Sequence, residues 1–183
     1  MLNIPNILTI IRLILIPGFA IAIVYQSYDY ALYIFIGAAV TDKLDGAIAR
    51  LTGKSTPLGA FLDPLADKFM LITASLLFFL FKLIPVWLAI LIITRDIIIM
   101  TGWFLLTLIL HASPRRMNPT RLGKLAVAAQ FALFSVILVE INFNMLYVLK
   151  DLLIWFSAGL TVLSGIDYIQ KGLFIASEHK TGD

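Results

Sequence analysis

The segment TDKLDGAIARLTGKSTPLGAFLDPLADK, residues 41–68, places four aspartates between two long apolar stretches: Asp42, Asp45, Asp63 and Asp67. Each stretch is long enough to cross a lipid bilayer, whose hydrocarbon core takes about 20 helical residues. A bare carboxylate within a membrane helix costs at least roughly 2.5–3.5 kcal/mol. Four of them close together need a partner that compensates their charge.

The composition of the whole chain indicates an integral membrane protein. Of its 183 residues, 61% are hydrophobic and 14% are charged, whereas soluble domains are about 45–50% apolar and roughly 25% charged. No long linker, repeat or low-complexity run interrupts the chain, which predicts a single domain over residues 1–183. Cysteine is absent, so disulfides and thiolate chemistry are excluded.

Hydropathy predicts an all-α fold of six transmembrane helices. We expect spans near residues 4–25, 31–50, 58–81, 84–110, 122–141 and 146–176. The N-terminal apolar run has no basic leader before it and no small-residue cleavage site, so we interpret it as a retained first span.

Basic residues indicate the orientation of these spans, because six spans put both termini on one side. That side carries Arg50, Lys54, Arg115, Arg116, Arg121, Lys124, Lys171 and Lys180. The other side carries Lys82 and Lys150. The positive-inside rule then makes the termini and the basic loops cytoplasmic. We expect the protein in the cell (inner) membrane. The net charge of +3 mostly reflects this asymmetry, so we predict no nucleic-acid partner.

The aspartates form two pairs at helical spacing. Asp42 and Asp45 are three residues apart near the end of the second predicted span, and Asp63 and Asp67 are four apart near the start of the third. At 100° per residue, each pair shares one helix face. Small residues, which allow a ligand or another backbone to come close, continue these faces: Gly46, Ala49 and Gly59.

Converging carboxylates favour one or two divalent cations. Oxygen ligands without a nearby His or Cys favour a hard ion such as Mg²⁺ or Mn²⁺. The basic residues Arg50 and Lys54 beside the acids suggest a ligand that contains phosphate. In the structural alternative, the acids pair with Arg50, Lys54 and Lys68 at a solvated membrane edge. The glycines on the same faces make that alternative less favourable.

The motif resembles the signature of the CDP-alcohol phosphotransferase family. It consists of Asp42-x-x-Asp45-Gly46-x-x-Ala49-Arg50, eight residues, and then Gly59-x-x-x-Asp63-x-x-x-Asp67. The N-terminal NIPNILTIIR (residues 3–12) and the chain length are also similar to that family. The resemblance implies an enzyme of phospholipid biosynthesis that joins a CDP-linked group to an alcohol and releases CMP, with CDP-diacylglycerol as the membrane-embedded donor.

The resemblance also implies roles for the residues of the motif. The four aspartates would bind two metal ions in a polar active-site cavity open to the cytoplasm, and Asp67 would also be the base for the acceptor hydroxyl. Gly46, Ala49 and Gly59 would line the cytidine pocket, and Arg50 would contact the nucleotide phosphates. The family likeness suggests a homodimer surrounded by membrane lipids.

A polar stripe in the first predicted span has two interpretations. Asn6, Thr9 and Arg12 are spaced three residues apart, so they follow one face of a helix. The family likeness makes them part of the site for CDP-diacylglycerol. In the alternative, Asn6 caps the helix and Arg12 extends to the membrane surface.

Cations in the fourth and fifth spans are candidates for the acceptor phosphate. Arg95 would meet that phosphate, although the adjacent Asp96 could instead neutralise it. Lys124 is a similar candidate, although lysines beside loops are common. Lys43 and Asp167 receive no assigned role.

The acceptor alcohol has two leading interpretations. The phosphatidylglycerophosphate branch typically has Arg-Glu in the fourth span, another arginine two turns later, and Lys-x-Lys-Thr-x-x-Gln in the fifth. This chain has Arg95-Asp96, Trp103 and KLAVAAQ at residues 124–130, so two cations are missing. LIPVWLAILIITRDIII (83–99) resembles the cardiolipin synthases, whereas Gly123-Lys124 and LSGIDYIQKG (163–172) resemble the other branch.

Both acceptors, glycerol 3-phosphate and phosphatidylglycerol, therefore stay open, and an inositol phosphate acceptor is less favoured.

Two other protein classes also use membrane aspartates. An intramembrane prenyltransferase binds a diphosphate through Asp-rich pairs and Mg²⁺, but it normally has more spans and a different spacing. A divalent-cation or proton-coupled transporter would have inverted repeats or broken helices in matched halves, and the sequence has neither.

Overall fold

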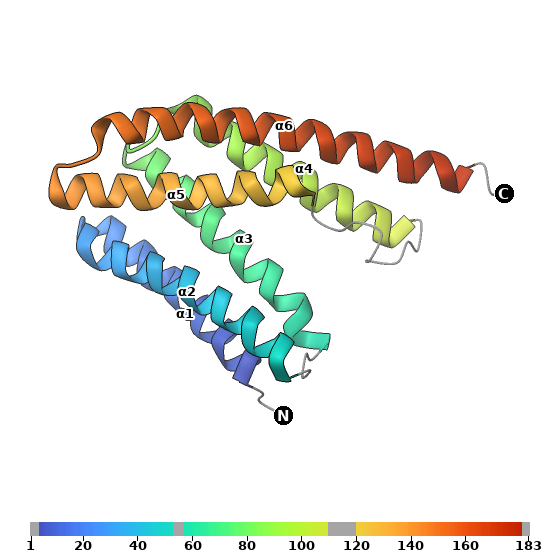
Figure 1. Ribbon diagram of the computed structural model, residues 1–183, viewed down its shortest axis with the longest axis horizontal. Coiled ribbons are helices and arrows are strands. Elements are labelled where there is room, and N and C mark those ends of the chain that lie inside the picture. Colours follow the sequence, from blue (N-terminus) through green and yellow to red (C-terminus); the bar gives the residue numbers. More distant parts are fainter. Residues whose placement is uncertain (1–3, 53–56, 110–119, 181–183) are drawn as a thin grey trace. The chain divides into compact units, whose positions relative to one another are not determined.

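The structure, a computed structural model, describes residues 4–52, 57–109 and 120–180, and the side chains of residues 10–41, 68–102 and 120–172. Within these ranges all regular secondary structure is helical, so the predicted all-α class is confirmed. The six described helices are α1 (Ile4–Val24), α2 (Tyr28–Thr52), α3 (Pro57–Leu80), α4 (Val86–Ile109), α5 (Arg121–Phe143) and α6 (Tyr147–Lys180) (Figure 1).

The short links after α1 and α3 each contain a residue in the left-handed backbone conformation. Gln26 after α1 and Lys82 after α3 both have φ of 58°. At each, the next residue donates a backbone hydrogen bond five residues back: Ser27 to Ala22 at 2.8 Å, and Leu83 to Phe78 at 2.7 Å. This pattern satisfies carbonyls that a helix end leaves unpaired. The chain therefore reverses within a few residues after α1 and α3.

The first compact unit contains Met1–Leu83 and Phe134–Tyr147. In it, α1 packs against both α2 and α3. Its core is a closed ring of four fully buried phenylalanines from four helices: Phe19, Phe35, Phe78 and Phe134. Successive ring centroids in this phenylalanine ring lie 5.6, 6.2, 5.0 and 6.2 Å apart, distances at which aromatic pairs attract each other.

The second compact unit contains Ile84–Leu133 and Val148–Asp183, and with them α4, the first part of α5 and most of α6. Apolar side chains such as Leu88, Ile92 and Leu133 are fully buried there. Polar side chains are buried among them: Arg95, Asp96, Thr120, Gln130, Ser157, Thr161 and Ser164. Buried polar groups must be hydrogen-bonded to be tolerated, so this unit is the part of the described structure in which side-chain polar contacts matter most.

Two of the described helices are long and apolar enough to cross a membrane: Arg121–Phe143, and α6 as far as Gly172. Shorter apolar segments occupy Ile10–Val24 and Lys68–Leu80. These features support membrane association, while the six-span topology stays a prediction. The prediction of a single domain over residues 1–183 is likewise not tested by the division into two units.

Candidate active site

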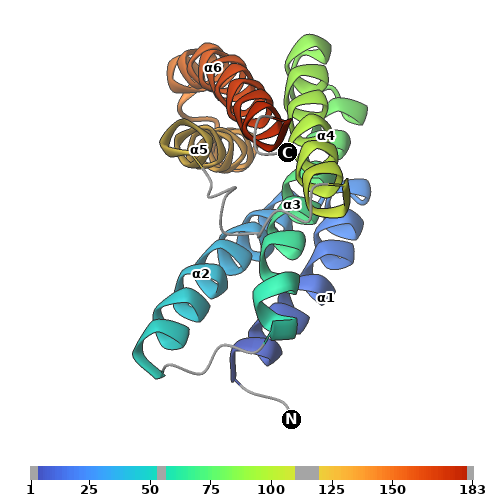
Figure 2. The same ribbon diagram turned by 90° about the vertical axis from the view of Figure 1, so that its right-hand side faces the viewer.

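The acid motif lies on the two helices that end and begin at the link 53–56. Asp42 and Asp45 belong to α2, and Asp63 and Asp67 belong to α3. Their side chains lie outside the described residues, so the backbone alone locates them. Figures 1 and 2 show α2 ending and α3 beginning at the same end of the first unit and running in opposite directions.

Helix geometry brings the two acid pairs to matching depths. Asp42 lies ten residues before the end of α2 at Thr52, and Asp67 lies ten residues after the start of α3 at Pro57, so each is about 15 Å along its helix at 1.5 Å per residue. Asp45 lies seven residues before the end of α2 and Asp63 lies six residues after the start of α3, at about 10.5 and 9 Å along their helices. The four-residue link 53–56 can join helix ends that are no more than about 18 Å apart.

This donor set suits a hard divalent cation. Carboxylate oxygens are the ligands that Mg²⁺ and Mn²⁺ prefer, and α2 and α3 each carry two aspartates of the motif. Among the side chains that the structure describes elsewhere, no three His, Cys, Asp or Glu gather as a metal site. The acid motif stays the predicted metal site.

The predicted nucleotide residues lie on the same three helices of the first unit. Asn6 and Thr9 are on α1, Gly46, Ala49 and Arg50 on α2, and Gly59 on α3. Their side chains, like those of the aspartates, lie outside the described residues. Their roles stay predictions.

Arg12 is the described member of the polar stripe on α1. Its side chain is 1% exposed and has an interaction partner within the structure. Arg12 lies eight residues after the start of α1, at about 12 Å along the helix, and α1 begins at the end of the unit where α2 and α3 are linked (Figures 1 and 2). Such burial does not favour the alternative in which Arg12 extends to the aqueous edge.

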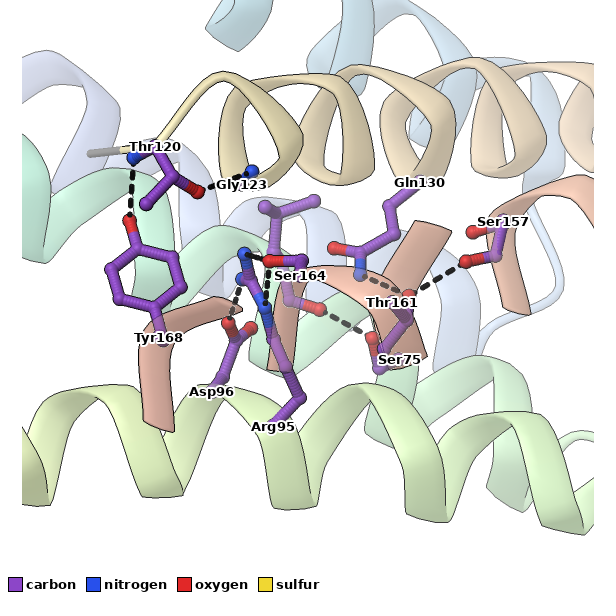
Figure 3. Close-up of polar contacts among 11 residues, drawn as sticks. Ser75, Arg95, Asp96, Thr120, Gly123, Gln130, Ser157, Thr161, Ser164 and Tyr168 are labelled. Atoms are coloured by element: carbon purple, nitrogen blue, oxygen red, sulfur yellow. Dashed lines mark hydrogen bonds and ion pairs between the residues drawn. The ribbon is translucent and has the colours of Figure 1, made fainter. Parts of the chain in front are cut away.

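The guanidinium of Arg95 is held by three side chains in the second unit (Figure 3). Its Nη1 donates to Asp96 Oδ1 at 2.6 Å, forming an ion pair between two buried residues. Its Nε and Nη2 donate to Ser164 Oγ at 3.2 and 2.6 Å. The Tyr168 ring lies over the guanidinium, with its centroid 5.7 Å from Cζ. We call Arg95, Asp96, Ser164 and Tyr168 the Arg95 cluster.

The start of α5 meets this cluster through Tyr168. Thr120 caps the helix, accepting a hydrogen bond from Gly123 N at 3.0 Å on its Oγ1. The backbone N of Thr120 donates a long bond of 3.4 Å to the Tyr168 hydroxyl. A Cβ on Gly123 would lie 2.8 Å from Tyr168 Cε2, so only glycine fits this approach. Lys124, the next residue, has an exposed side chain.

A second buried polar network lies on α5 and α6, next to the cluster in sequence (Figure 3). Gln130 Nε2 donates to Thr161 Oγ1 at 3.2 Å, and Thr161 Oγ1 donates to the carbonyl of Ser157 at 2.7 Å. None of these three residues forms a described hydrogen bond with Arg95. The network therefore ties α6 to α5 independently of the Arg95 cluster.

Comparison with known proteins identifies the family. Residues 2–163 match the sequence model of the CDP-alcohol phosphatidyltransferase family. The chain belongs to this family. The predicted resemblance and the prediction of an enzyme are thereby confirmed.

Curated relatives in this family align with most of the chain. A Bacillus subtilis protein named CDP-diacylglycerol–glycerol-3-phosphate 3-phosphatidyltransferase is 33% identical, with 93% of this chain and 95% of the relative covered. A Pseudomonas fluorescens protein of the same name is 34% identical over 92% of this chain and 89% of its own length. The human cardiolipin synthase (CMP-forming) is 32% identical over 93% of this chain and 62% of its own length.

Family membership also bears on the metal. CDP-alcohol phosphatidyltransferases generally use divalent metal ions, which agrees with the donor set on α2 and α3. The identity of the ion and the expected number of two stay predictions.

Sequence reasoning placed Arg95 and Lys124 at the acceptor phosphate and left open a neutralising pair with Asp96. The structure contains that pair, and the acceptor role stays a prediction. Sequence reasoning missed Ser164 and Tyr168, which lie on another helix 69 or more residues from Arg95. The available signal was their spacing of four residues, which puts both on one face of α6.

Proposed function

We propose that the protein transfers the phosphatidyl group of CDP-diacylglycerol to a hydroxyl of a glycerol-type acceptor in phospholipid biosynthesis, with release of CMP. The observation that carries the proposal is the complete acid motif at matching depths on α2 and α3 in a chain of the CDP-alcohol phosphatidyltransferase family. The names of its relatives support the same donor. The family match favours this activity over a prenyltransferase or a cation transporter.

The four aspartates of the motif would hold two ions, Mg²⁺ or Mn²⁺, which when bound would neutralise charge on the diphosphate. Arg50 and Arg12 would bind the phosphates of the donor, and Gly46, Ala49 and Gly59 would leave room for its cytidine. Asn6 and Thr9 would contribute polar contacts to the same donor. These assignments rest on the motif and on the burial of Arg12.

In the proposed reaction, Asp67 would accept the proton of the acceptor hydroxyl as its oxygen attacks. The acceptor oxygen forms a bond to the phosphorus nearer the diacylglycerol, and the bond from that phosphorus to the bridging oxygen of the diphosphate breaks. CMP leaves with the electron pair. A metal-bound carboxylate is a weak base at neutral pH, but it can accept a proton while the new bond forms.

The proposed topology has six spans with both termini cytoplasmic in the cell (inner) membrane. Most basic residues lie at the termini and at the links after α2 and α4. Exposed aromatic residues, Tyr25, Trp87 and Tyr147, lie at the other links. Basic side chains gather on the cytoplasmic side, which supports this orientation, and aromatic side chains gather at both membrane–water interfaces, which supports a membrane boundary at these links. A homodimer is proposed from the family likeness.

Two acceptors are candidates, each with an observation in its favour. The bacterial relatives that align with nearly the whole chain are named for glycerol 3-phosphate. Phosphatidylglycerol is favoured by the pairing of Arg95 with Asp96, because a compensated cation suits a singly charged phosphodiester better than a phosphomonoester dianion. Lys124 would supply the second positive charge near either acceptor.

The test is thin-layer analysis of lipid products from purified protein with labelled CDP-diacylglycerol and Mg²⁺ or Mn²⁺. Glycerol 3-phosphate, phosphatidylglycerol and inositol phosphate are supplied separately, and CMP is quantified. We expect acceptor-dependent CMP release with one of the two glycerol-type acceptors. Absence of CMP with all three acceptors would refute the proposed function.

A matched pair of variants on α2 controls this experiment. Asp45→Asn removes a proposed metal ligand and should eliminate the lipid product. Asp29→Asn makes the same chemical change at an exposed position in the first turn of the same helix and should leave product formation intact. Equal activity of the two variants would contradict the metal site.

A further inference from the structure

The Arg95 cluster engages three of the five N–H groups of the guanidinium. A guanidinium has five N–H groups. Ser164 Oγ accepts one from Nε and one from Nη2, and Asp96 accepts one from Nη1. In the described contacts, one N–H on Nη1 and one on Nη2 remain. Two such groups on one guanidinium match two oxygens of a phosphate.

The arrangement of Ser164 and Asp96 explains why these two N–H groups form no hydrogen bond within the cluster. Arginine and a carboxylate tend to pair through two parallel hydrogen bonds. Here Ser164 occupies the edge formed by Nε and Nη2, so Asp96 pairs through Nη1. The aliphatic part of Arg95 passes over Gly165, with Cγ 3.8 Å from the position of a Cβ there, which lets the side chain lie close along α6.

Tyr168 restricts the guanidinium from a different direction. Its ring lies over the face of the guanidinium, and its other contacts are with Thr120 and Gly123 at the start of α5. The ring is thus wedged between Arg95 and the turn that precedes Lys124. Tyr168 on α6 therefore contacts both Arg95 and the turn before Lys124.

We propose that Ser164 and Tyr168 are positioning residues that hold Arg95 with two N–H groups directed at the anionic group of the acceptor alcohol. This inference rests on the proposed function. Arginine has a long side chain with many rotamers, and fixing it before the ligand arrives improves binding by lowering the entropy lost on binding. Neither residue touches the acceptor, so their effect should fall on acceptor affinity alone.

The experiment compares steady-state kinetics of four variants on α6 with the acceptor that the wild type uses. Ser164→Ala frees the Nε edge of Arg95, which can then rotate onto Asp96, and should raise the acceptor KM about tenfold. Tyr168→Leu removes the ring over the guanidinium and should raise it about fivefold. Tyr168→Phe keeps the ring and loses only the long bond to Thr120, so its acceptor KM should stay within about twofold of the wild-type value.

Thr161→Ala is the matched control, because it also removes a buried hydroxyl from α6. That hydroxyl forms hydrogen bonds with Gln130 and with the carbonyl of Ser157, and none with Arg95. The acceptor KM of Thr161→Ala should equal that of the wild type. In all four variants, kcat and the KM for CDP-diacylglycerol should change by less than about twofold. A variant that only loosened the fold would change these values together with the acceptor KM, and Thr161→Ala would behave like Ser164→Ala.

The outcomes separate this inference from the proposed function. Wild-type protein that releases CMP, together with Ser164→Ala and Tyr168→Leu variants that keep the wild-type acceptor KM, would overturn the positioning role and leave the proposed function standing. Equal losses in Tyr168→Phe and Tyr168→Leu would also overturn it. Wild-type protein that releases no CMP with any acceptor would refute the proposed function and this inference with it.

Discussion

The ion pair of Arg95 and Asp96 allows a quantitative test of the second unit. The two side chains meet at 2.6 Å and are 7% and 2% exposed. Replacing Asp96 by Asn removes the negative charge, keeps a similar shape, and leaves the guanidinium buried without compensation. We expect Asp96→Asn to destabilise the protein and the double variant Arg95→Met/Asp96→Leu to recover most of the loss.

The magnitude follows from the burial of the pair. Removing one partner of a buried ion pair costs about 3–5 kcal/mol, whereas replacing both by apolar residues is often neutral. Asn retains an oxygen that can accept from Nη1, so the loss should be near about 3 kcal/mol. For a chain of this length that corresponds to a decrease in Tm of about 6–12 °C. An exposed pair would change stability by about 0–1 kcal/mol.

The assay is thermal unfolding of detergent-solubilised protein, followed by circular dichroism, for Asp96→Asn, for the single variants Arg95→Met and Asp96→Leu, and for the double variant that combines these two. Asp151→Asn is the matched control, because Asp151 is an exposed aspartate in the same unit, and its Tm should stay near the wild-type value. A Tm for Asp96→Asn equal to that of the control would refute the buried pair. A double variant that loses the sum of the two single effects would refute the coupling between the two residues.

Four further outcomes are expected. Replacing any one of Asp42, Asp45 and Asp63 by asparagine should abolish turnover without unfolding the protein, and chelation by EDTA should do the same reversibly. Activity and circular dichroism measured on the same samples would check this. Arg50→Ala should raise the KM for CDP-diacylglycerol more than the acceptor KM; an unchanged donor KM would contradict its placement. Gly123→Ala should lower Tm, because its Cβ would lie 2.8 Å from Tyr168 Cε2, and an unchanged Tm would mean that the ring moves freely. If glycerol 3-phosphate is the acceptor, Arg95→Ala and Lys124→Ala should each raise its KM by about tenfold or more. If phosphatidylglycerol is the acceptor, the effects should be modest and millimolar glycerol 3-phosphate should not compete.

The helices could be predicted from the sequence because long apolar runs and short polar breaks mark them directly. The first expected span, 4–25, matches α1 at Ile4–Val24. The second was expected from residue 31, but α2 begins at Tyr28. The polar residues QSYDY (26–30) between the two expected spans suggest a loop, whereas Asp29 lies in the first turn of α2, where a carboxylate stabilises the helix N-terminus.

The two parts of the candidate site differ in how much of their geometry could be predicted from the sequence. The acid motif is local: its spacing fixes one face of each helix, and the short link fixes the matching depths of the pairs. The Arg95 cluster depends on tertiary packing, because α4 and α6 are distant in sequence. Nothing near Arg95 in the sequence indicates that Ser164 rather than Asp96 occupies its Nε edge. That fact emerges only when the helices are packed.

The phenylalanine ring of the first unit has a consequence for the order in which the protein matures. Three of its members come from α1, α2 and α3, but the fourth, Phe134, comes from α5. The ribosome must therefore release α4 and much of α5 before that core can close. Until then the nascent chain exposes Phe35 and Phe78, which are apolar surfaces that lipid tails tolerate and water does not. With the proposed six-span topology, insertion into the bilayer during synthesis would protect this incomplete core from aggregation.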